Sequence, residues 1–471
     1  MNIENLITEV TSIVKTKIQN FCEKENTTEL TEELSLKMIG QTKEILSLIG
    51  SETLQHFFEQ YDSKEKTITE DGKLYRLKYK SKKDFLTSVG VIGYERNVYQ
   101  QDKGGKSIIP LDKKWNMERQ YVCKDVQESL LYSCAHNTPE ETAEIFNKIS
   151  LLCIHPTTIK KVIDKTGEWI EEHKESMIKE VYKNEELPDS PDVVVGSLDG
   201  VNVLLREKGK KKGRPQERPG DTTKEEPSSA YKNAMCGTVS FYNVEKDEET
   251  GKKSSSRIMT KYTSRMPQDR YVNFKEEFEA EIKHCISNKS VKKIMLTDCH
   301  KSIQGYIKDN PFFKGFDWMI DFFHAAEHLS KLSKHLFGKS TKEGQNWYSQ
   351  KREELKYKEN GVSKLIRSAE YFIKKLKSKT RIKEARKQLM YFKNHKRLMN
   401  YSLHIENGWP IGSGVVEAAC KSVVKQRMCR SGQRWTRTGG QKILNLRTII
   451  KSKRWDIFWN AYTEMKKKEA A

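Results

Sequence analysis

The sequence is poor in the residues that mark several classes of protein. Its nine cysteines are odd in number, scattered and never spaced as Cys-x-x-Cys, so they do not indicate a disulfide framework or a zinc ribbon and they fit a reducing cytoplasm. Only 11 Pro and 26 Gly exclude collagen-like and low-complexity chains. No apolar run reaches the roughly 18 residues needed to cross a bilayer, and the start, MNIENLITEV, does not resemble a signal peptide.

What the chain has in excess is positive charge. Its 471 residues are enough for two or three domains with a sizeable core. Lys and Arg total 86 against 65 Asp and Glu, a formal charge of +21, which favours a polyanionic partner. The 19 Tyr, 17 Phe and 8 Trp are too many aromatic residues for a disordered chain.

The first 185 residues are predicted to be helical with a small β region. Apolar spacing predicts helices up to about residue 75, and strands follow at Tyr75–Tyr79 and within Phe85–Tyr99. Thr138-Pro139-Glu140-Glu141 combines a capping box with Pro at the first helical position, and its helix ends near Ser150. Pro156 opens another helix to about Glu180. Residues 138–180 are thus a helix-turn-helix candidate for binding DNA, with two helices of an ordinary bundle as the alternative.

The second part of the chain alternates strands and helices in an informative order. Three strands, a helix, a strand, a helix and a strand are typical of a ribonuclease H-like domain, an α/β fold with a mixed five-stranded sheet. We assign this domain to residues 190–325 and 411–460, with a helical, basic insertion at 326–410. The expected strands are Val193–Arg206, Met235–Val244, Arg257–Thr263, Val291–Leu296 and Phe316–Phe323, and the expected helices are Phe274–Ser287, Ser302–Lys308 and one from Gly412-Ser413-Gly414 to Val424.

Three carboxylates occupy positions where this fold would bring them together. Asp199 lies in the first strand, Asp298 ends the fourth, and Glu417 lies in the late helix. Cleaving or joining a phosphodiester in line uses two Mg²⁺ ions held by carboxylates, and Mn²⁺ is an alternative ion. Each residue also has a simpler explanation: Asp199-Gly200 as a hairpin turn, Asp298 as a helix N-cap, and Glu417 as the partner of Lys421.

The C-terminal region carries charge of one sign. Between Ala418 and Trp455 there is no Asp or Glu, which calls for a polyanion or for acidic partners elsewhere in the chain; a basic surface without a particular ligand is the alternative. The loop Lys208–Arg218 is a second, nonspecific DNA-contact candidate. The predicted DNA-binding residues are Lys421, Lys425, Arg427, Arg430, Arg434, Trp435 and Arg437, with Trp435 placed to stack on a base.

Two histidines follow the fifth strand. His324 and His328 are four residues apart and share a helix face, but the sequence shows no third metal ligand near them. We assign His324 to the catalytic site, where it would orient groups or contact phosphate. The alternative is a histidine that caps the core.

Several segments resemble the ISKra-type insertion-sequence transposases. They are SLDG at 197–200, LTDCH at 296–300, DFFHAAEHL at 321–329 and the long block from Ile411 to Trp459. The resemblance runs from about residue 190 to 460. It implies a DDE transposase with a ribonuclease H-like catalytic domain, whose metal-binding triad is Asp199, Asp298 and Glu417.

One region departs from that family. Relatives often have paired cysteines before a Pro-Leu-Asp sequence, whereas Asn97–Asp112 keeps Pro110-Leu111-Asp112 without any cysteine, so no zinc is expected. The sequence therefore predicts a cytoplasmic, Mg²⁺-dependent transposase, associated with the nucleoid when bound to DNA. It would act as a homo-oligomer on terminal inverted repeats and target DNA, without a membrane partner. The alternatives are a transposon-derived DNA-binding protein without catalysis and a nuclease of the same fold.

Overall fold

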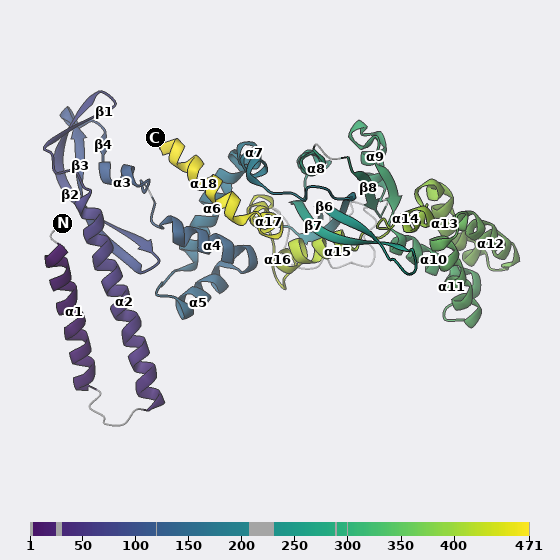
Figure 1. Ribbon diagram of the computed structural model, residues 1–471, viewed down its shortest axis with the longest axis horizontal. Helices are drawn as coiled ribbons and strands as arrows, with labels where there is room; N and C mark the ends of the chain where they lie inside the picture. The colour runs from purple at the N-terminus through teal and green to yellow at the C-terminus, as the bar shows by residue number, and fades with distance from the viewer. Residues whose placement is uncertain are drawn as a thin grey trace, which may run out of the picture. The chain divides into compact units, whose positions relative to one another are not determined.

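The computed structural model describes residues 3–24, 31–118, 120–206, 230–287, 290–298 and 300–470 (Figure 1). The chain forms two compact units. Unit 1 comprises Met1–Glu180 together with Asp456–Ala471, and unit 2 comprises Val181–Trp455. Within the described ranges, no helix is long and apolar enough to cross a membrane.

Unit 1 begins with two long helices and an antiparallel sheet. Helices α1 (Ile3–Lys24) and α2 (Glu32–Gln60) pack together, and α2 also packs on β3. The predicted helical region up to residue 75 is wrong beyond Gln60, because Asp71 and Gly72 both adopt positive φ and form a tight turn that pairs β1 with β2. The sheet has the order β1-β2-β3-β4, with strands β1 (Thr67–Glu70), β2 (Lys73–Thr87), β3 (Gly90–Gln101) and β4 (Ser107–Ile108).

The region around Pro110-Leu111-Asp112 is held by aromatic packing and a buried carboxylate. These residues start the short helix α3 (Pro110–Lys114). Asp112 is buried, and it accepts hydrogen bonds from Tyr94 Oη at 2.6 Å and Lys83 Nζ at 2.9 Å. Beside it, the Phe58 and Trp115 rings lie 3.9 Å apart. This packing joins α2, the sheet and α3 in one aromatic core.

A helical group completes unit 1. The capping box predicted at Thr138 is confirmed, because its side chain accepts from Glu141 N and Glu141 accepts from Thr138 N. The helix predicted to run from Pro156 to Glu180 is interrupted at His173, which separates α6 from α7. The helices are α4 (Lys124–His136), α5 (Pro139–Ile149), α6 (Pro156–Glu172), α7 (Lys174–Asn184) and α18 (Trp455–Ala470).

Unit 2 is built on the predicted five-stranded mixed sheet, with the order β7-β6-β5-β8-β9. β5, β6 and β7 are antiparallel neighbours, whereas β8 runs parallel to β5 and β9 runs parallel to β8. The last strand is shorter than predicted, because Asp321 caps a helix that begins at Phe322. The strands are β5 (Val193–Leu204), β6 (Tyr231–Lys246), β7 (Lys253–Arg265), β8 (Lys292–Thr297) and β9 (Asp317–Ile320).

Helices cover both faces of this sheet. α8 (Val272–Ile286) packs on one face through Phe278 and Ile282, and Gly237 allows its close approach, since a Cβ there would lie 2.6 Å from the Phe278 ring. α15 (Gly414–Ala419) packs on β5 and β6, and Figure 1 shows it on the side of the sheet away from α8. α17 (Arg437–Lys451) packs on β7. The sheet's alternation places Asp199 on the opposite face from Leu198.

The predicted helical insertion is a bundle that continues the core of the sheet. Val193 and Ile294 of the sheet share one apolar cluster with Leu329, Leu365 and Phe392 of the bundle. Its helices are α10 (Phe322–Phe337), α11 (Lys342–Tyr357), α12 (Gly361–Lys375), α13 (Lys379–His395) and α14 (Tyr401–Glu406), and the remaining helices of the unit are α9 (Lys301–Asp309) and α16 (Gln426–Met428).

Candidate functional site

Asp199 and Asp298 are brought together by the pairing of β5 with β8. The parallel register pairs Ser197 with Leu296, and the same offset places Asp199 beside Asp298, which directly follows β8. Asp199 is not in a turn, since β5 continues to Leu204 and pairs Asp199 with Cys236 of β6. The hairpin-turn explanation of Asp199-Gly200 is therefore wrong.

The environment of Asp199 disfavours its negative charge. Burial raises the pKa of the Asp199 carboxyl above its usual range, and the nearby Asp298 raises it further. The Gly200 N–H, which donates to Asp199 Oδ1 at 2.6 Å, acts in the opposite direction without reversing the shift. A cation between the two carboxylates would stabilise their ionised forms.

Asp298 lies two residues before the N-cap of the helix that follows it. Its Oδ1 accepts a hydrogen bond from His300 N at 3.0 Å, and His300 is the N-cap of α9. The N-cap explanation of Asp298 is therefore wrong for this helix. The bond to His300 holds the carboxylate at the end of β8, where it neighbours Asp199.

α15 carries the third predicted carboxylate, Glu417, but the three described residues Asp199, Asp298 and Glu417 are not arranged as a group that could hold a metal ion. Glu417 is exposed, and Cys420, three residues later, lies with its Sγ 3.6 Å from Asp199 Oδ2. Contact with Cys236 and burial raise the pKa of the Cys420 thiol, so it remains a donor to Asp199. Residues three apart share a helix face, so Glu417 lies one turn before Cys420, the residue that contacts Asp199. No ion pair joins Glu417 to Lys421, both of which the structure describes.

The helix that carries Glu417 widens into a π-helical segment, Cys420–Lys425, where the sequence predicted a regular helix through Val424. Arg447 of α17 accounts for this geometry. Its Nε donates to Val423 O at 2.6 Å, and its Nη2 donates to Ser422 O. Burial lowers the pKa of Arg447 to about 10, with Arg427 and Arg430 adding to the shift. A buried guanidinium thus fixes the helical segment next to Asp199.

Asp321, which sequence reasoning missed, joins three segments near the site. It is buried, and it accepts from His324 N at 2.7 Å and from Ser413 N just before α15. Its own N–H donates to Thr297 O at 2.9 Å, at the end of β8. The sequence signal for this role is the N-cap pattern, an Asp three residues before His324 at the start of a helix.

His324 and His328 lie on α10, as predicted. Their ring centroids are 5.1 Å apart, and His328 stacks on Tyr391 at 3.7 Å with its Nδ1 2.8 Å from Gln388 Oε1. Burial lowers the pKa of His328. Among the residues with described positions, no group of three or more His, Cys, Asp or Glu side chains is arranged to hold a metal ion.

The basic residues of the Ala418–Trp455 window divide into buried and exposed sets. Lys421, Lys425, Arg434 and Arg437 are exposed and Arg430 is half-exposed, whereas Arg427, Lys442, Arg447 and Arg454 are buried. The Arg427 guanidinium lies 4.9 Å from the Trp435 ring centroid, and Trp435 Nε1 donates to Met428 O at 3.0 Å. Arg437 Nη1 donates to Pro267 O at 2.8 Å. The candidate loop Lys208–Arg218 lies outside the described residues.

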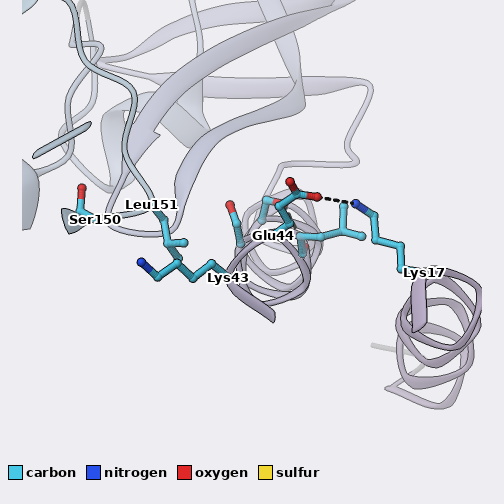
Figure 2. A pocket seen from close by; sticks show the side chains of 8 residues that line it. Lys17, Lys43, Glu44, Ser150 and Leu151 are labelled. Atoms are coloured by element: carbon cyan, nitrogen blue, oxygen red, sulfur yellow. Dashed lines mark hydrogen bonds and ion pairs between the residues drawn. The ribbon is translucent and has the colours of Figure 1, made fainter. Parts of the chain in front are cut away.

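Unit 1 contains a cavity of about 390 Å³ beside its first two helices (Figure 2). The Lys17–Glu44 ion pair, with a 3.7 Å separation, bridges α1 and α2 at this cavity, and Ser150 and Leu151 lie across from Lys43. The residues that line this cavity belong to unit 1, whereas the predicted site residues belong to unit 2.

Comparisons with known proteins give a structural likeness but no match in sequence. No protein-family model matches the sequence, and no curated protein matches it. Among solved structures, the chain has a low similarity to a chain of the Drosophila P element transposase strand transfer complex, with a TM-score of 0.26 and 12% sequence identity. The match covers 76% of this chain and 84% of that one.

Proposed function

We propose that the protein is a Mg²⁺-dependent DNA transposase of the DDE type with a ribonuclease H-like catalytic domain. The observation that carries this proposal is the juxtaposition of Asp199 and Asp298 at the paired ends of β5 and β8. Acidic pairs at this position suit chemistry on phosphodiesters, because they can hold divalent cations against a polyanionic substrate.

The order of the strands supports the ribonuclease H-like assignment. An antiparallel β5-β6-β7 meander is followed by β8 and β9, which lie parallel to β5 on its other side. This arrangement puts the first and fourth strands of the domain next to each other, and each carries one of the carboxylates. Glu417 on α15 is proposed as the third member of the triad, since Cys420 of the next turn contacts Asp199.

The acidic pair fits a divalent ion. Mg²⁺ binds in proteins through one or two carboxylates, with water and substrate phosphate completing the shell. The raised pKa of Asp199 is the electrostatic sign of a site that a cation would stabilise. Asp199, Asp298 and Glu417 would hold the ions, which supply activation of the attacking oxygen and stabilisation of the leaving oxygen. His324, held through its backbone by Asp321, would orient groups or contact phosphate beside them.

DNA would lie along the exposed basic residues that follow Glu417. Lys421, Lys425, Arg434 and Arg437 are open to solvent, and the insertion adds 21 Lys and Arg against six acidic residues between Lys331 and Arg397. These side chains would bind backbone phosphates and fix the position of the protein on the duplex. The protein would bind the element's terminal repeats, hydrolyse the ends to free 3′-hydroxyls, and join those hydroxyls to target DNA.

The proposal is tested with purified protein, DNA ending in the inverted repeats that flank the gene, and Mg²⁺. Wild-type protein should nick the ends and transfer strands, whereas Glu417→Gln should bind the same DNA but lose at least about 100-fold in nicking rate, because several kcal/mol of charge stabilisation disappear. Glu406→Gln, at an exposed Glu of α14, is the matched control and should remain active.

The same assay separates the alternatives. Nicking without strand transfer would identify a nuclease, and DNA binding without nicking would identify a DNA-binding protein of transposon origin. Wild-type nicking by the Glu417→Gln variant would remove Glu417 from the site.

A further inference from the structure

A buried carboxylate at the end of β9 lies next to the end of β8. Asp321 is 1% exposed and directly follows β9, as Asp298 directly follows β8. The parallel register pairs Ile320 with Thr297, and the same offset places Asp321 beside Asp298. The backbone N–H of Asp321 donates to Thr297 O at 2.9 Å. Asp321 is therefore bonded to the residue that precedes Asp298.

The side chain of Asp321 binds the start of α15. Its Oδ2 accepts a hydrogen bond from the backbone N–H of Ser413, which is the N-cap of α15 and is itself buried. Ser413 O accepts in turn from Glu417 N at 3.3 Å. A series of three hydrogen bonds thus connects Thr297, next to Asp298, with the backbone of Glu417.

Capping of α10 does not explain why this residue is an aspartate. Asp321 Oδ1 accepts from His324 N at 2.7 Å, which is the N-cap bond of α10. Asn is as good an N-cap as Asp, and it avoids the cost of burying a charge. Among the residues that the structure describes, no Lys, Arg or His forms an ion pair with Asp321. What a carboxylate offers over an amide is a second acceptor oxygen, and here that oxygen binds Ser413.

We propose that Asp321 is a positioning residue of the acidic site, which fixes the start of α15, and with it the backbone of Glu417, relative to Asp298. This role rests on the proposed function, since it belongs to the same reaction. Both oxygens of Asp321 already accept backbone N–H groups, so we assign it no contact with the ions or the DNA. Because Glu417 is exposed, its side chain can still rotate, and Asp321 determines only where that side chain starts.

The test uses the full-length Asp321→Asn variant, which keeps the size of the side chain but has one acceptor oxygen. Hydrogen exchange in Gly414–Ala419 should become at least about 10-fold faster, whereas β5 should exchange as in the wild type. Nicking of the element-end DNA should lose about 10- to 100-fold in kcat with an unchanged KM, because a small displacement of a reacting group slows chemistry without removing the DNA-binding residues.

A second variant covers the case in which the new amide turns its oxygen toward Ser413. Asp321→Ser has a single side-chain oxygen and is an equally good N-cap, so it can bind His324 N but is too short to bind Ser413 as well. It should show the same faster exchange in α15 and the same loss of kcat.

Two controls separate positioning from other roles. Thr341→Ala removes the N-cap bond to Gly344 N at the start of α11, in the same helical bundle. It should lower the melting temperature but leave nicking unchanged, so a general loss of stability is not the cause. Added Mg²⁺ should raise the melting temperature of Asp321→Asn as much as that of the wild type, because Asp199 and Asp298 are intact. A loss of this stabilisation would make Asp321 an ion ligand and would overturn the positioning role.

Two further results would overturn it. One is native exchange in α15 in both Asp321 variants, and the other is faster exchange with wild-type kcat. A wild-type protein that binds the DNA without nicking it would refute the proposed function instead, and the exchange measurement would still decide whether Asp321 holds the start of α15.

Discussion

Asp199 carries a partly buried charge next to a second carboxylate. Folding raises its pKa through burial, with Asp298 adding to the effect. A carboxyl with a raised pKa stabilises the fold below its unfolded pKa of 3.8, and that stability is lost as pH rises through the folded pKa. At neutral pH the ionised Asp199 therefore lowers the stability of the fold. A charged residue that destabilises the fold is typical of a functional site.

We predict that Asp199→Asn raises the melting temperature at neutral pH in the absence of divalent ions, and that the gain shrinks near pH 3.8. Nicking should fall at least about 100-fold. Thermal unfolding of both proteins with and without Mg²⁺ provides the measurement. Added Mg²⁺ should stabilise the wild type more than the variant, and equal stabilisation would contradict a site at Asp199.

A buried ion cluster is the other notable arrangement of single residues in unit 2. Arg454 Nη2 lies 2.6 Å from both Glu185 Oε2 and Glu281 Oε1, and Lys261 also pairs with Glu185. Burial alone would raise the pKa of Glu185, but hydrogen bonds from His284, Arg454 and Lys261 lower it to about 2. Glu185 thus contributes stability above pH 4.5, which is lost as pH falls toward 2.

Replacement of Arg454 by Met should destabilise unit 2 by about 3–5 kcal/mol, because two buried carboxylates lose their common partner. Urea unfolding followed by hydrogen exchange at β5 and β8 of unit 2 measures this loss. Adding Glu281→Gln to the Arg454→Met variant should restore part of the stability. A double variant less stable than the single one would show that the Glu281 charge is satisfied without Arg454.

At the scale of elements, the π-helical segment Cys420–Lys425 links α15 to the basic surface. π-Helical turns are common at functional sites, and here the carbonyls of Ser422 and Val423 are bound by Arg447. The Arg447 fork can satisfy two carbonyls at once, which Lys cannot do with the same geometry. The segment that follows Glu417 therefore depends on a residue of another helix.

Arg447→Lys should lower nicking about 10-fold with little change in DNA affinity, since roughly one hydrogen bond that orders this segment is removed. Hydrogen exchange should become faster at Cys420–Lys425 and stay unchanged in β5. A variant with native exchange in this segment but lower nicking would assign Arg447 a direct role instead.

The exposed basic residues after this segment should set the salt dependence of DNA binding. Each phosphate neutralised adds a slope of about −0.9 to log K against log salt. Replacing Arg430, Arg434 and Arg437 together by Ala should flatten the slope by up to about three units. The control replaces the exposed Lys64, Lys66 and Lys73 of unit 1 by Ala, which removes the same charge. Equal slopes for the two variants would show that the arginines are not at the DNA interface.

At the scale of the whole molecule, unit 1 is closed by the C-terminal end of the chain. Tyr462 Oη accepts from Gln127 Nε2 at 3.0 Å, and Trp169 Nε1 donates to Glu469 Oε1 at 2.7 Å. Phe458 and Trp459 are buried. The chain thus leaves unit 1, forms all of unit 2 and returns to complete unit 1.

Truncation after Trp455 should unfold the helical part of unit 1 but leave unit 2 intact. The reason is that α4 and α6 lose the buried aromatic side chains of α18. Hydrogen exchange should increase in α4 and α6 and stay native in β5 and β8. Protection retained in α6 would show that α18 is dispensable for this packing.

Much of unit 2 follows from local patterns in the sequence. Strand-forming residues and an amphipathic helix at 274–287 predicted β5 to β8 and α8 within a few residues, because alternation and helical spacing are set by which face is buried. The sequence also predicts Asp199 beside Asp298, because the first and fourth strands of a ribonuclease H-like sheet are neighbours, and β5 does pair with β8. The capping box at Thr138 was equally local.

Interactions between distant residues decided the rest. Asp321 ends β9 earlier than predicted because it accepts a hydrogen bond from Ser413 N, 92 residues along the chain. The predicted helical region ends early for a local reason, the Asp71-Gly72 turn between β1 and β2. Tertiary packing buries Arg427 against Trp435. It also buries Arg454 against Glu185 and Glu281. The run of basic residues in the sequence is therefore partly in the core and partly on the surface. The sequence by itself determined which residues form the elements and carry the charge; tertiary structure decided which charges face solvent, since burial depends on partners far along the chain.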